Sequence, residues 1–568
     1  MYDLLIKGGL IVDGSGMPAH YGDLAITDGK IAELGRLDGP ATRVINAEGR
    51  VVAPGFIDNH CHFDAQVTWD PLCTFSPNHG VTTVIFGNCS LGLAPVRPDG
   101  HDALAMMLSR VEAIPMESLE AGVDWDWETF PEYLDKIDTR LGVNVGVMMG
   151  HSAIRQYVMG EDAREREQAT PEELAEMKAI VRDGIRAGAV GLSFDRNRGH
   201  LDLLGRRIPG IVAPFDEIYE LCSALQGLSA GVLQCGSAYP HEIKDGFATK
   251  MGDISGRPVV YNQITYSQNV PNQWREHLDL VEERVREGRQ VYPVINPRPQ
   301  SVRFTMRSGQ VFDRLPAWQP LMILEPAAKI AAFSDLENRE KMRTESDGIN
   351  LPPTAFGIVW DRVHVTRTVL PKNAELQGKS IAAIAAAQGK HPVDALLDLA
   401  LEEDLNTSFG SSQSGGDDGA MATMLQSPYT VIGLSDAGAH VVFEAGYGYS
   451  SIVLGHWVRD QGVLSLEEAI RKLTFMQASL YGMHDRGLLW QGMAADIVIF
   501  DLATISADEP EEAYDLPAGM MRLAQRATGV DFTIVNGQIL LENGEHSGAL
   551  PGRVMRNSAY SMAAGTTE

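Results

Sequence analysis

The chain has 568 residues, a formal net charge of −28 at pH 7 and a pI of about 4.9. Its 44% hydrophobic and 21% charged residues are typical of a globular protein that can bury a large core. Because so acidic a chain repels phosphate groups, the composition argues against nucleic acid or an anionic membrane as partner and favours an enzyme for a small molecule.

The first residues, MYDLLIKGGLIVDGSG, are apolar but interrupted by Lys7, Gly8 and Asp13. They lack the basic start and long apolar core of a signal peptide, so we expect none. No stretch approaches the roughly 18 apolar residues of a membrane-spanning helix. The five cysteines are scattered between residues 61 and 235, which does not suggest a disulfide framework. We therefore expect a cytoplasmic protein.

Both ends of the chain are rich in short strands. Residues 1–54 alternate apolar and polar side chains between Gly, Asp and Asn turns, and residues 486–568 repeat this pattern, with an Asn-Gly turn at 536–537. Neither end alone offers enough strands for a stable core. We therefore predict one small composite β-sandwich domain built from residues 1–54 and 486–568.

The middle of the chain, residues 55–485, alternates buried strands with amphipathic helical stretches such as 170–188. The candidate strands lie at 55–62, 81–89, 144–151, 189–195, 231–236, 259–266, 290–296 and 429–436. Eight strand-then-helix units predict an α/β fold, a parallel (β/α)₈ TIM-like barrel, whose chemistry lies at the carboxyl ends of the strands. Residues 298–425 are too long for one connection and are interpreted as an insertion. Within it we expect 410–421, GSSQSGGDDGAM, to be a mobile loop near the barrel mouth.

Polar side chains collect where these strands end. In an extended strand, His60 and His62 point to the same side and Cys61 away from it. Other strand ends supply Asn88, Cys89, His151, Arg155, Ser193, Asp195, Arg196, Asp436 and His440. Taken singly, each has an ordinary explanation, such as a buried small hydrophobe for Cys89 or a turn for Asp436. Taken together, imidazole, thiolate and carboxylate at one barrel mouth indicate a divalent transition metal, with zinc first.

Ordered motifs along almost the whole chain carry a family resemblance. They include APGFIDNHCHFDAQ, HGVTTVIFGNCSLGLAPV, GHSAIR, QVYPVIN, LQGKSIAAIAAAQGKHPVDALLDL, GLSDAGAHV, SLEEAIRKLT, GMAADIVIFD and VNGQILLENGEHSGALPGRVMR. The sequence resembles the amidohydrolase superfamily and, within it, the N-acyl-D-amino-acid deacylase (D-aminoacylase-like) family. The resemblance implies a metal-bearing barrel beside a β-sandwich.

The resemblance also implies roles for individual residues. His60 and His62 would be metal ligands, and Cys89 would stand where other amidohydrolases use a carboxylated lysine. Asp436 resembles the aspartate that is a metal ligand, activates the water and later protonates the leaving amine. This agrees with elementary chemistry, because a bound metal lowers the pKa of water toward about 7 and a neighbouring carboxylate can transfer its proton. His151 is our candidate donor to the oxyanion.

The sequence departs from the family at strands 5 and 6, where D-aminoacylases present histidines. Here Gln234 stands at the first position and Asn262 or Gln263 at the second. Neutral amides are poor zinc ligands. We therefore favour a single metal ion, with the amides binding substrate; two ions, with His200 or His241 as a replacement ligand, remain the alternative.

Further residues are candidates for binding substrate, beside Gln234, Asn262 and Gln263. They are Arg155, Ser193, Tyr292 and His440. An arginine such as Arg155 could hold a carboxylate through a bidentate fork, although a structural ion pair is the commoner role.

Three functional hypotheses remain open from the sequence. The leading one is a metal-dependent hydrolase of the C–N bond in an N-acyl (D-)amino acid or related small amide. The second is a hydrolase of cyclic amides or imides, which would use the same chemistry, and the third is a scaffold that kept the fold and lost the metal. By analogy alone we also expect association into a homo-oligomer.

Overall fold

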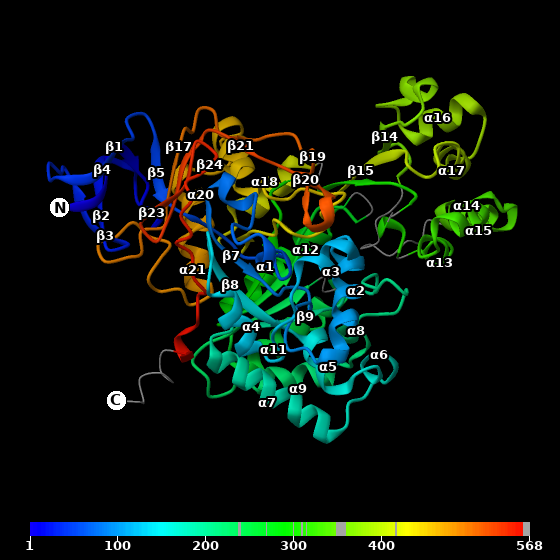
Figure 1. Ribbon diagram of the computed structural model, residues 1–568, viewed down its shortest axis with the longest axis horizontal. Helices are drawn as coiled ribbons and strands as arrows, with labels where there is room; N and C mark the ends of the chain where they lie inside the picture. Colours follow the sequence, from blue (N-terminus) through cyan, green and yellow to red (C-terminus); the bar gives the residue numbers. More distant parts are fainter. Residues whose placement is uncertain are drawn as a thin grey trace.

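A computed structural model gives the fold of the chain (Figure 1). The structure describes residues 1–236, 240–267, 270–298, 300–307, 310–313, 315–347, 359–414 and 417–560.

The centre of the molecule is a parallel barrel sheet, as predicted. In the described part of the chain it has eight strands: β6 (Phe56–Asp58), β7 (Val81–Phe86), β8 (Asn144–Gly150), β9 (Gly191–Asp195), β10 (Val232–Gly236), β11 (Val259–Asn262), β12 (Val291–Ile295) and β16 (Val431–Ile432). They are paired in chain order, each with its sequence neighbour. The predicted strand segments therefore all lie in this sheet. Every residue of β7 is buried, as expected for a parallel strand covered on both faces.

The first and last strands meet just beyond their carboxyl ends. The backbone N–H of Asp436 donates to the carbonyl of His60 at 3.2 Å, and the N–H of His62 donates to the carbonyl of Ala437 at 2.8 Å. Gly433 lets the chains approach, since an added Cβ there would lie only 1.9 Å from Asn59 Oδ1. The residues that close the barrel are thus those of the predicted site.

Helices cover the outside of the barrel (Figure 1). They are α1 (Gln66–Trp69), α2 (His101–Val111), α3 (Met116–Gly122), α4 (Phe130–Ile137), α5 (His151–Met159), α6 (Asp162–Glu165), α7 (Pro171–Ala187), α8 (Pro209–Val212), α9 (Phe215–Ser223), α10 (Pro240–Lys244), α11 (Phe247–Ser255), α12 (Gln273–Arg286), α18 (Asp418–Gln426), α19 (Tyr449–Ile452), α20 (Leu466–Leu473) and α21 (Phe475–Leu480). The sequence explains α7 well. Thr170 and Glu173 form a reciprocal capping box at its start, and Pro171 occupies the first helical position.

Strands from both chain ends share one sheet, drawn in blue and orange-red at the upper left of Figure 1. In the described residues it comprises β1 (Tyr2–Ile11), β2 (His20–Thr27), β3 (Lys30–Gly35), β4 (Ala41–Asn46), β5 (Val51–Pro54), β17 (Ile497–Phe500), β22 (Val530–Val535), β23 (Gln538–Glu542) and β24 (Glu545–His546). The junction between the two ends is the antiparallel pair β5–β17. This confirms a sheet-rich second domain assembled from both termini. Its core contains Ile6 and Val52 from one end and Ile497 and Ile534 from the other.

Short strand pairs follow β17, namely β18 (Ser506–Ala507) with β21 (Ala527–Thr528), and β19 (Glu511–Leu516) with β20 (Met520–Ala524). After β24 the chain returns to the barrel. The N–H of Val145 donates to the carbonyl of Arg553, and the Asn557 amide donates to the carbonyl of Ile185. The domain boundary at residue 486 stays a prediction. The end of the predicted β-sandwich segment, around residues 553–557, packs on the barrel and not on the sheet.

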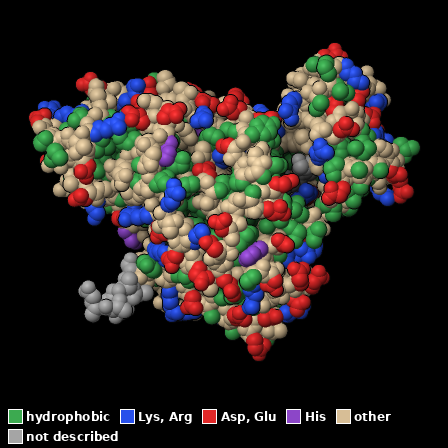
Figure 2. All heavy atoms as spheres, in the orientation of Figure 1, with side chains coloured by type: hydrophobic (Ala, Val, Ile, Leu, Met, Phe, Trp, Pro, Cys, Tyr) green, Lys and Arg blue, Asp and Glu red, His purple; other side chains and the backbone are tan. Residues whose placement is uncertain are grey.

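The insertion is a lobe with its own core, at the upper right of Figures 1 and 2. It contains β13 (Gln300–Phe304), β14 (Val363–Arg367) and β15 (Ser408–Ser414), with α13 (Gln319–Met322), α14 (Pro326–Ser334), α15 (Leu336–Asp347), α16 (Ile381–Gln388) and α17 (Pro392–Glu402). Trp318, Phe333 and Phe409 are fully buried in this core. Our expectation of a mobile loop at 410–421 was wrong for its described part. β15 pairs with β13 and β14, and α18 begins at Asp418, because tertiary strand pairing outweighs the Gly/Ser composition.

Acidic and basic side chains are interspersed over the face drawn in Figure 2. No helix in the described residues is long and apolar enough to cross a membrane.

A buried ion pair joins the barrel to the β-domain. Arg486 and Asp496 are both almost inaccessible and form a direct salt bridge. Asp496 also accepts from the side chain of Asn144 in β8 at 3.0 Å and from the N–H of Asn536 at 2.7 Å. Three segments therefore depend on one carboxylate.

We predict that Asp496→Ala lowers the free energy of unfolding by about 3–5 kcal/mol, because it leaves Arg486 buried with its charge largely uncompensated. The matched control is Asp485→Ala, which removes the exposed partner of the same arginine and should cost at most about 1 kcal/mol. Urea unfolding followed by circular dichroism measures both. Equal losses in the two variants would contradict the prediction.

Candidate metal centre

The two histidines after β6 lie as the sequence predicts. His60 and His62 are 1% and 2% exposed, and their rings pack edge to face with centroids 5.2 Å apart. Cys61 between them turns to the other side, where its thiol contacts the carbonyl of Ile85 at 3.1 Å. The alternation of an extended segment thus brings both imidazoles to the barrel mouth.

Cys89, just after β7, lies beside the first histidine. Its Sγ is 3.4 Å from Nε2 of His60. The residue adopts a positive φ of 52°, and its N–H donates to the side-chain oxygen of Gln234 at 3.2 Å. Burial raises the pKa of the Cys89 thiol well above its ordinary value. A metal ion that binds the thiolate must therefore displace this proton, which makes metal affinity increase with pH.

Asp436, just after β16, reaches both histidines. Its Oδ1 lies 3.5 Å from Nε2 of His60 and 3.7 Å from Nε2 of His62. Burial alone would raise the pKa of this carboxyl, but the hydrogen bond from His62 and the charges of His60 and His62 hold it well below its usual value. Asp436 is therefore an anion throughout the neutral pH range.

The donor atoms of these residues fit one small cation. His60, His62 and Cys89 offer ligand atoms that all lie within 4.8 Å of one another. Around a tetrahedral zinc ion with bonds of about 2.0–2.3 Å, neighbouring donors lie roughly 3.3–3.8 Å apart. The separations of 3.4, 3.5 and 3.7 Å among Cys89, the histidines and Asp436 match this spacing.

Glu112, at the carboxyl end of α2, lies against the second histidine. It is 1% exposed, and its Oε1 lies 3.2 Å from Nδ1 of His62, on the side of the ring away from Asp436. Burial lowers the pKa of His62, but Glu112 and then Asp436 outweigh it and raise that pKa to about 9. The carboxylates thus stabilise positive charge at this point, which a divalent cation would supply. A carboxylate behind a metal-bound histidine is a recurring arrangement.

Two further acids flank the histidine pair in sequence. Asp58 is buried, accepts from the hydroxyl of Ser435 and the N–H of His60, and has a pKa that burial raises to about 7. Asp64 is also buried, and desolvation raises its pKa to about 6. Asp58 connects strands 1 and 8 at the site.

Carboxamides occupy the ends of strands 5 and 6. Gln234 in β10 accepts from the N–H of Cys89, and the Asn262 side-chain nitrogen lies 3.3 Å from both ring nitrogens of His60. Both predicted residues are therefore beside the cluster. Gln263 follows Asn262 and is partly buried.

The structure places three predicted residues in internal contacts. His151 contacts Glu217 at 2.8 Å, and Arg155 forms an ion pair with the same carboxylate and donates to three backbone carbonyls. The Ser193 hydroxyl contacts the carbonyl of Gly87 at 2.5 Å and accepts from the N–H of Ser90. Glu217 from α9 and the backbone occupy Arg155, Ser193 and Nε2 of His151, whereas Nδ1 of His151 is buried without a partner among the described residues. The roles of these three residues stay predictions, and the proposed chemistry does not use them.

His440 and Tyr292 are the remaining predicted residues, and only His440 has a recorded interaction with the cluster. His440 stacks on Phe443, has a positive φ of 54°, and is near enough to influence the pKa values of His60 and Asp436. Tyr292 is half-buried on β12. Their roles remain predictions.

Sequence reasoning missed Glu112, and it did not foresee how Asp195 and His200 pair. Nδ1 of His200 lies 2.5 Å from the fully buried Asp195. A Cβ added to Gly236 would be 2.9 Å from the Cys89 sulfur and 3.1 Å from Asp195 Oδ1, so this acid borders the cluster. Asp58 and Asp64 could have been found in the sequence beside His60 and His62, whereas no motif marks Glu112.

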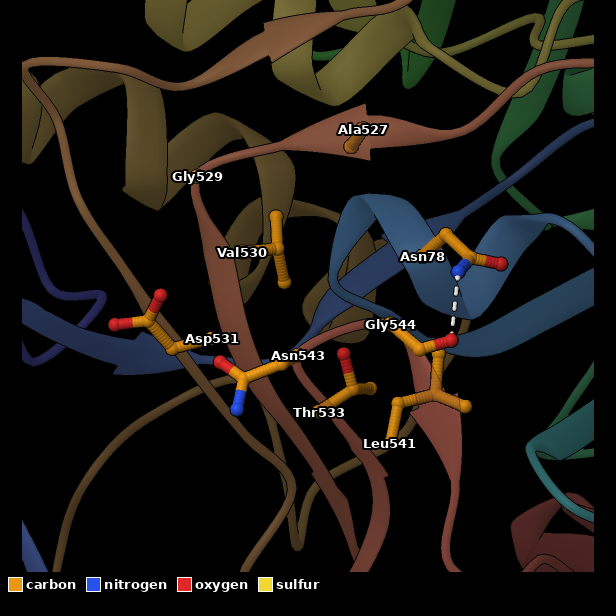
Figure 3. Close-up of a pocket in the computed structure, with 9 residues that line it drawn as sticks. All are labelled: Asn78, Ala527, Gly529, Val530, Asp531, Thr533, Leu541, Asn543 and Gly544. Atoms are coloured by element: carbon orange, nitrogen blue, oxygen red, sulfur yellow. Dashed lines mark hydrogen bonds between the residues drawn. The ribbon is translucent and has the colours of Figure 1, made fainter.

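A separate pocket lies between the β-domain and the segment before β7 (Figure 3). It is lined by Asn78, Ala527, Gly529, Val530, Asp531, Thr533, Leu541, Asn543 and Gly544. Its acid, Asp531, pairs with Arg50, while Thr533 donates to the carbonyl of Pro77 and Asn78 donates to that of Gly544. These nine residues include no histidine or cysteine, the side chains that zinc prefers beside carboxylates.

Comparison with known proteins identifies the family. The sequence profile of the amidohydrolase family matches residues 43–314 and 353–541. The chain belongs to the amidohydrolase family. An uncharacterised protein of Mycobacterium tuberculosis H37Rv is 30% identical over 94% of this chain and 92% of its own length. The D-aminoacylase of Alcaligenes xylosoxydans xylosoxydans is 27% identical over 98% of both chains. The N-acyl-D-aspartate deacylase of the same organism is 29% identical over 97% of this chain and 95% of its own length.

Solved amidohydrolase structures have a fold similar to that of this chain. A D-aminoacylase superposes with a TM-score of 0.68 at 25% identity, covering 98% of this chain and 100% of its own. The N-acyl-D-glutamate deacylase of Bordetella bronchiseptica, complexed with zinc and a phosphonate inhibitor, gives 0.67 at 24% identity over 98% and 99%. The L-hydantoinase of Arthrobacter aurescens shares the fold, with a TM-score of 0.52 at 14% identity over 98% and 100%. The protein is a metal-dependent amidohydrolase, a hydrolase of C–N amide bonds, related to the N-acyl-D-amino acid deacylases.

We predict that Glu112→Gln weakens zinc binding about 10- to 100-fold, because the ring of His62 loses its anionic partner. Competition with a chromogenic chelator measures the affinity. Glu120→Gln, on the exposed face of α3, is the matched control and should bind zinc like the wild type. Unchanged affinity in Glu112→Gln would show that Glu112 does not orient the ligand.

Proposed function

We propose that this amidohydrolase is a zinc-dependent deacylase of small N-acyl amino acids. The names of its relatives, D-aminoacylase and N-acyl-D-aspartate deacylase, support a preference for the D configuration. The observation that supports this most directly is the buried cluster of His60, His62 and Cys89, with the Asp436 carboxylate 3.5 and 3.7 Å from the two histidines. These residues would hold the ion. The zinc-bound deacylase structure of similar fold is consistent with this choice of metal.

The residues of the cluster would have different roles in amide hydrolysis. When bound, zinc would lower the pKa of water and polarise the scissile carbonyl. Asp436 is anionic and stands between the two histidines, so it can take the proton from the attacking water. It then returns that proton to the leaving nitrogen, which departs as a neutral amine. His60 and His62 stay fixed, the second by Glu112.

We further propose that one ion is sufficient. The positions that would complete a second site carry Gln234 and Asn262, and neutral amides bind zinc poorly. A solved D-aminoacylase with a binuclear centre is described as activated by one metal and attenuated by the second. A mononuclear centre is therefore compatible with deacylation in a related enzyme.

A cytoplasmic location completes the proposal. All five cysteines are free and buried, which is compatible with a reducing compartment.

Cyclic amides remain the second candidate substrates, supported only by the shared fold of the hydantoinases. A panel of N-acyl amino acids and hydantoins separates the two, because faster opening of the rings would refute the linear-amide proposal.

We predict that Asp436→Asn reduces kcat by at least about 10³-fold while His60, His62 and Cys89 still bind zinc, because the variant cannot accept the proton. Amide turnover and elemental analysis are measured on the same sample. Chelation of the wild type should abolish turnover, and added zinc should restore it. Substantial turnover in Asp436→Asn would refute its role as acid and base.

We predict that the double variant Gln234→His/Asn262→His binds a second equivalent of zinc, because imidazoles then face the cluster from strands 5 and 6. Elemental analysis should rise from about one to about two ions per chain. The control Gln226→His/Asn272→His places the same residues at exposed positions and should stay at one. Two ions per chain in the wild type would contradict the mononuclear proposal.

A further inference from the structure

The peptide group that joins Ser435 to Asp436 is held at both of its ends. Its N–H, which belongs to Asp436, donates to the carbonyl of His60 at 3.2 Å. Its carbonyl, which belongs to Ser435, accepts a hydrogen bond from the side chain of Arg298 at 3.1 Å. Because a peptide group is planar and rigid, the two bonds together fix its orientation. They therefore also fix the point from which the Asp436 side chain extends.

Asp436 depends on such a restraint because of its backbone conformation. The residue has a left-handed φ of 53°, which is unfavourable for a residue that carries a Cβ. Relaxation of this angle would rotate the Cα–Cβ bond. The carboxylate would then leave its place 3.5 Å from His60 and 3.7 Å from His62. The bonds that hold the peptide therefore also hold the general base beside the metal ligands.

Arg298 is itself fixed in place. It follows the end of β12 by three residues and is 7% exposed. Its backbone N–H donates to the side-chain oxygen of Asn296 at 3.1 Å, and the carbonyl of Pro297 accepts from the Trp457 indole at 2.7 Å. The nitrogen that does not contact Ser435, Nη1, forms an ion pair with Glu444 at 2.6 Å. Both terminal nitrogens of the guanidinium thus have partners in the segment that follows β16.

The two partners of Arg298 lie on either side of Asp436 in the chain. Ser435 precedes Asp436, and Glu444 follows it by eight residues. The chain then returns to its starting point at Gly446. An added Cβ there would lie 1.5 Å from the Ser435 carbonyl oxygen and 2.7 Å from Nη2 of Arg298. The planar fork of one guanidinium therefore closes the base of the loop, and a lysine ammonium has no such fork.

We propose that Arg298 is a positioning residue for the general base. Its side chain holds the peptide between Ser435 and Asp436 so that the carboxylate of Asp436 faces the metal ligands. The inference rests on the proposed deacylase function and adds to it a residue outside the metal cluster. The competing explanation is a structural ion pair of Arg298 with Glu444, which would stabilise the fold without directing Asp436.

The first experiment separates catalysis from substrate binding. Arg298→Met is compared with the wild type on the zinc-loaded full chain, with the best N-acyl amino acid of the substrate panel. We expect kcat to fall at least about 30-fold with KM nearly unchanged, because a small displacement of a catalytic group is costly. Zinc should still bind. A wild-type kcat, or a loss that lies in KM alone, would overturn the proposal.

A matched control removes a buried arginine far from the barrel mouth in sequence. Arg339 is 8% exposed in the insertion lobe and pairs with Asp394 and Asp398. Arg339→Met should lower the melting temperature about as much as Arg298→Met but keep the wild-type kcat. Equal losses of kcat in the two variants would show a general effect of stability and would refute the positioning role.

A second variant covers the case in which Arg298→Met does not fold. Arg298→Lys keeps the positive charge opposite Glu444 but lacks the fork that also reaches Ser435. We expect it to fold and bind zinc, with a kcat well below that of the wild type. A wild-type kcat in Arg298→Lys would show that the charge alone is sufficient, which contradicts the proposal.

A spectroscopic measurement requires no turnover. Cobalt(II) replaces zinc in the full chain, and its visible absorption reports the ligands around the ion. We expect Arg298→Met to shift the spectrum toward that of Asp436→Asn, and Arg339→Met to leave it unchanged. The proposal fails if Arg298→Met has the wild-type spectrum. It also fails if Asp436→Asn does, because the carboxylate then does not reach the ion.

The spectrum also separates this inference from the proposed function. If cobalt is bound and no N-acyl compound is hydrolysed by the wild type, the deacylase proposal fails. The comparison of Arg298→Met with Asp436→Asn then still decides whether Arg298 positions Asp436.

Discussion

The site depends on how the barrel closes. Two backbone hydrogen bonds join the ends of the first and last strands, and they involve His60, His62, Asp436 and Ala437. Three of the four proposed ligands, His60, His62 and Asp436, therefore take part in the closure itself. The hydrogen bonds set the spacing of the imidazoles and the carboxylate before any side-chain contact is made. The cost of holding buried acids and histidines together is offset by the free energy of forming the barrel.

The charge around the cluster is asymmetric. Asp58, Asp64 and Asp436 lie near the ends of strands 1 and 8, Glu112 joins them from the end of α2, and Asp195 borders the cluster from strand 4. Gln234 and Asn262 face the cluster from strands 5 and 6 without charge. A cation is thus attracted to one side of the mouth, and the opposite side is left for polar, neutral contacts.

The sequence predicted the parts of this arrangement that depend on local pattern. Strand periodicity located all eight barrel strands, and the spacing of His60 and His62 placed them on one side. Glu112 could not be foreseen, because its contact with His62 depends on where α2 ends against the barrel. Arg155 was proposed for substrate because nothing in the sequence shows that Glu217 lies against it. The glycine and serine content of 410–421 predicted a loop, because the sequence does not show that β13 and β14 are pairing partners for this segment.

The return of the chain after β24 has a consequence for biosynthesis. Val145 in the third barrel strand bonds to Arg553, and Ile185 at the end of α7 bonds to Asn557. The β-domain likewise pairs β5 with β17, more than 400 residues later. This C-terminal segment is synthesised after all eight barrel strands. A nascent chain therefore exposes unpaired backbone groups on the barrel and on the β-domain until this segment has been synthesised.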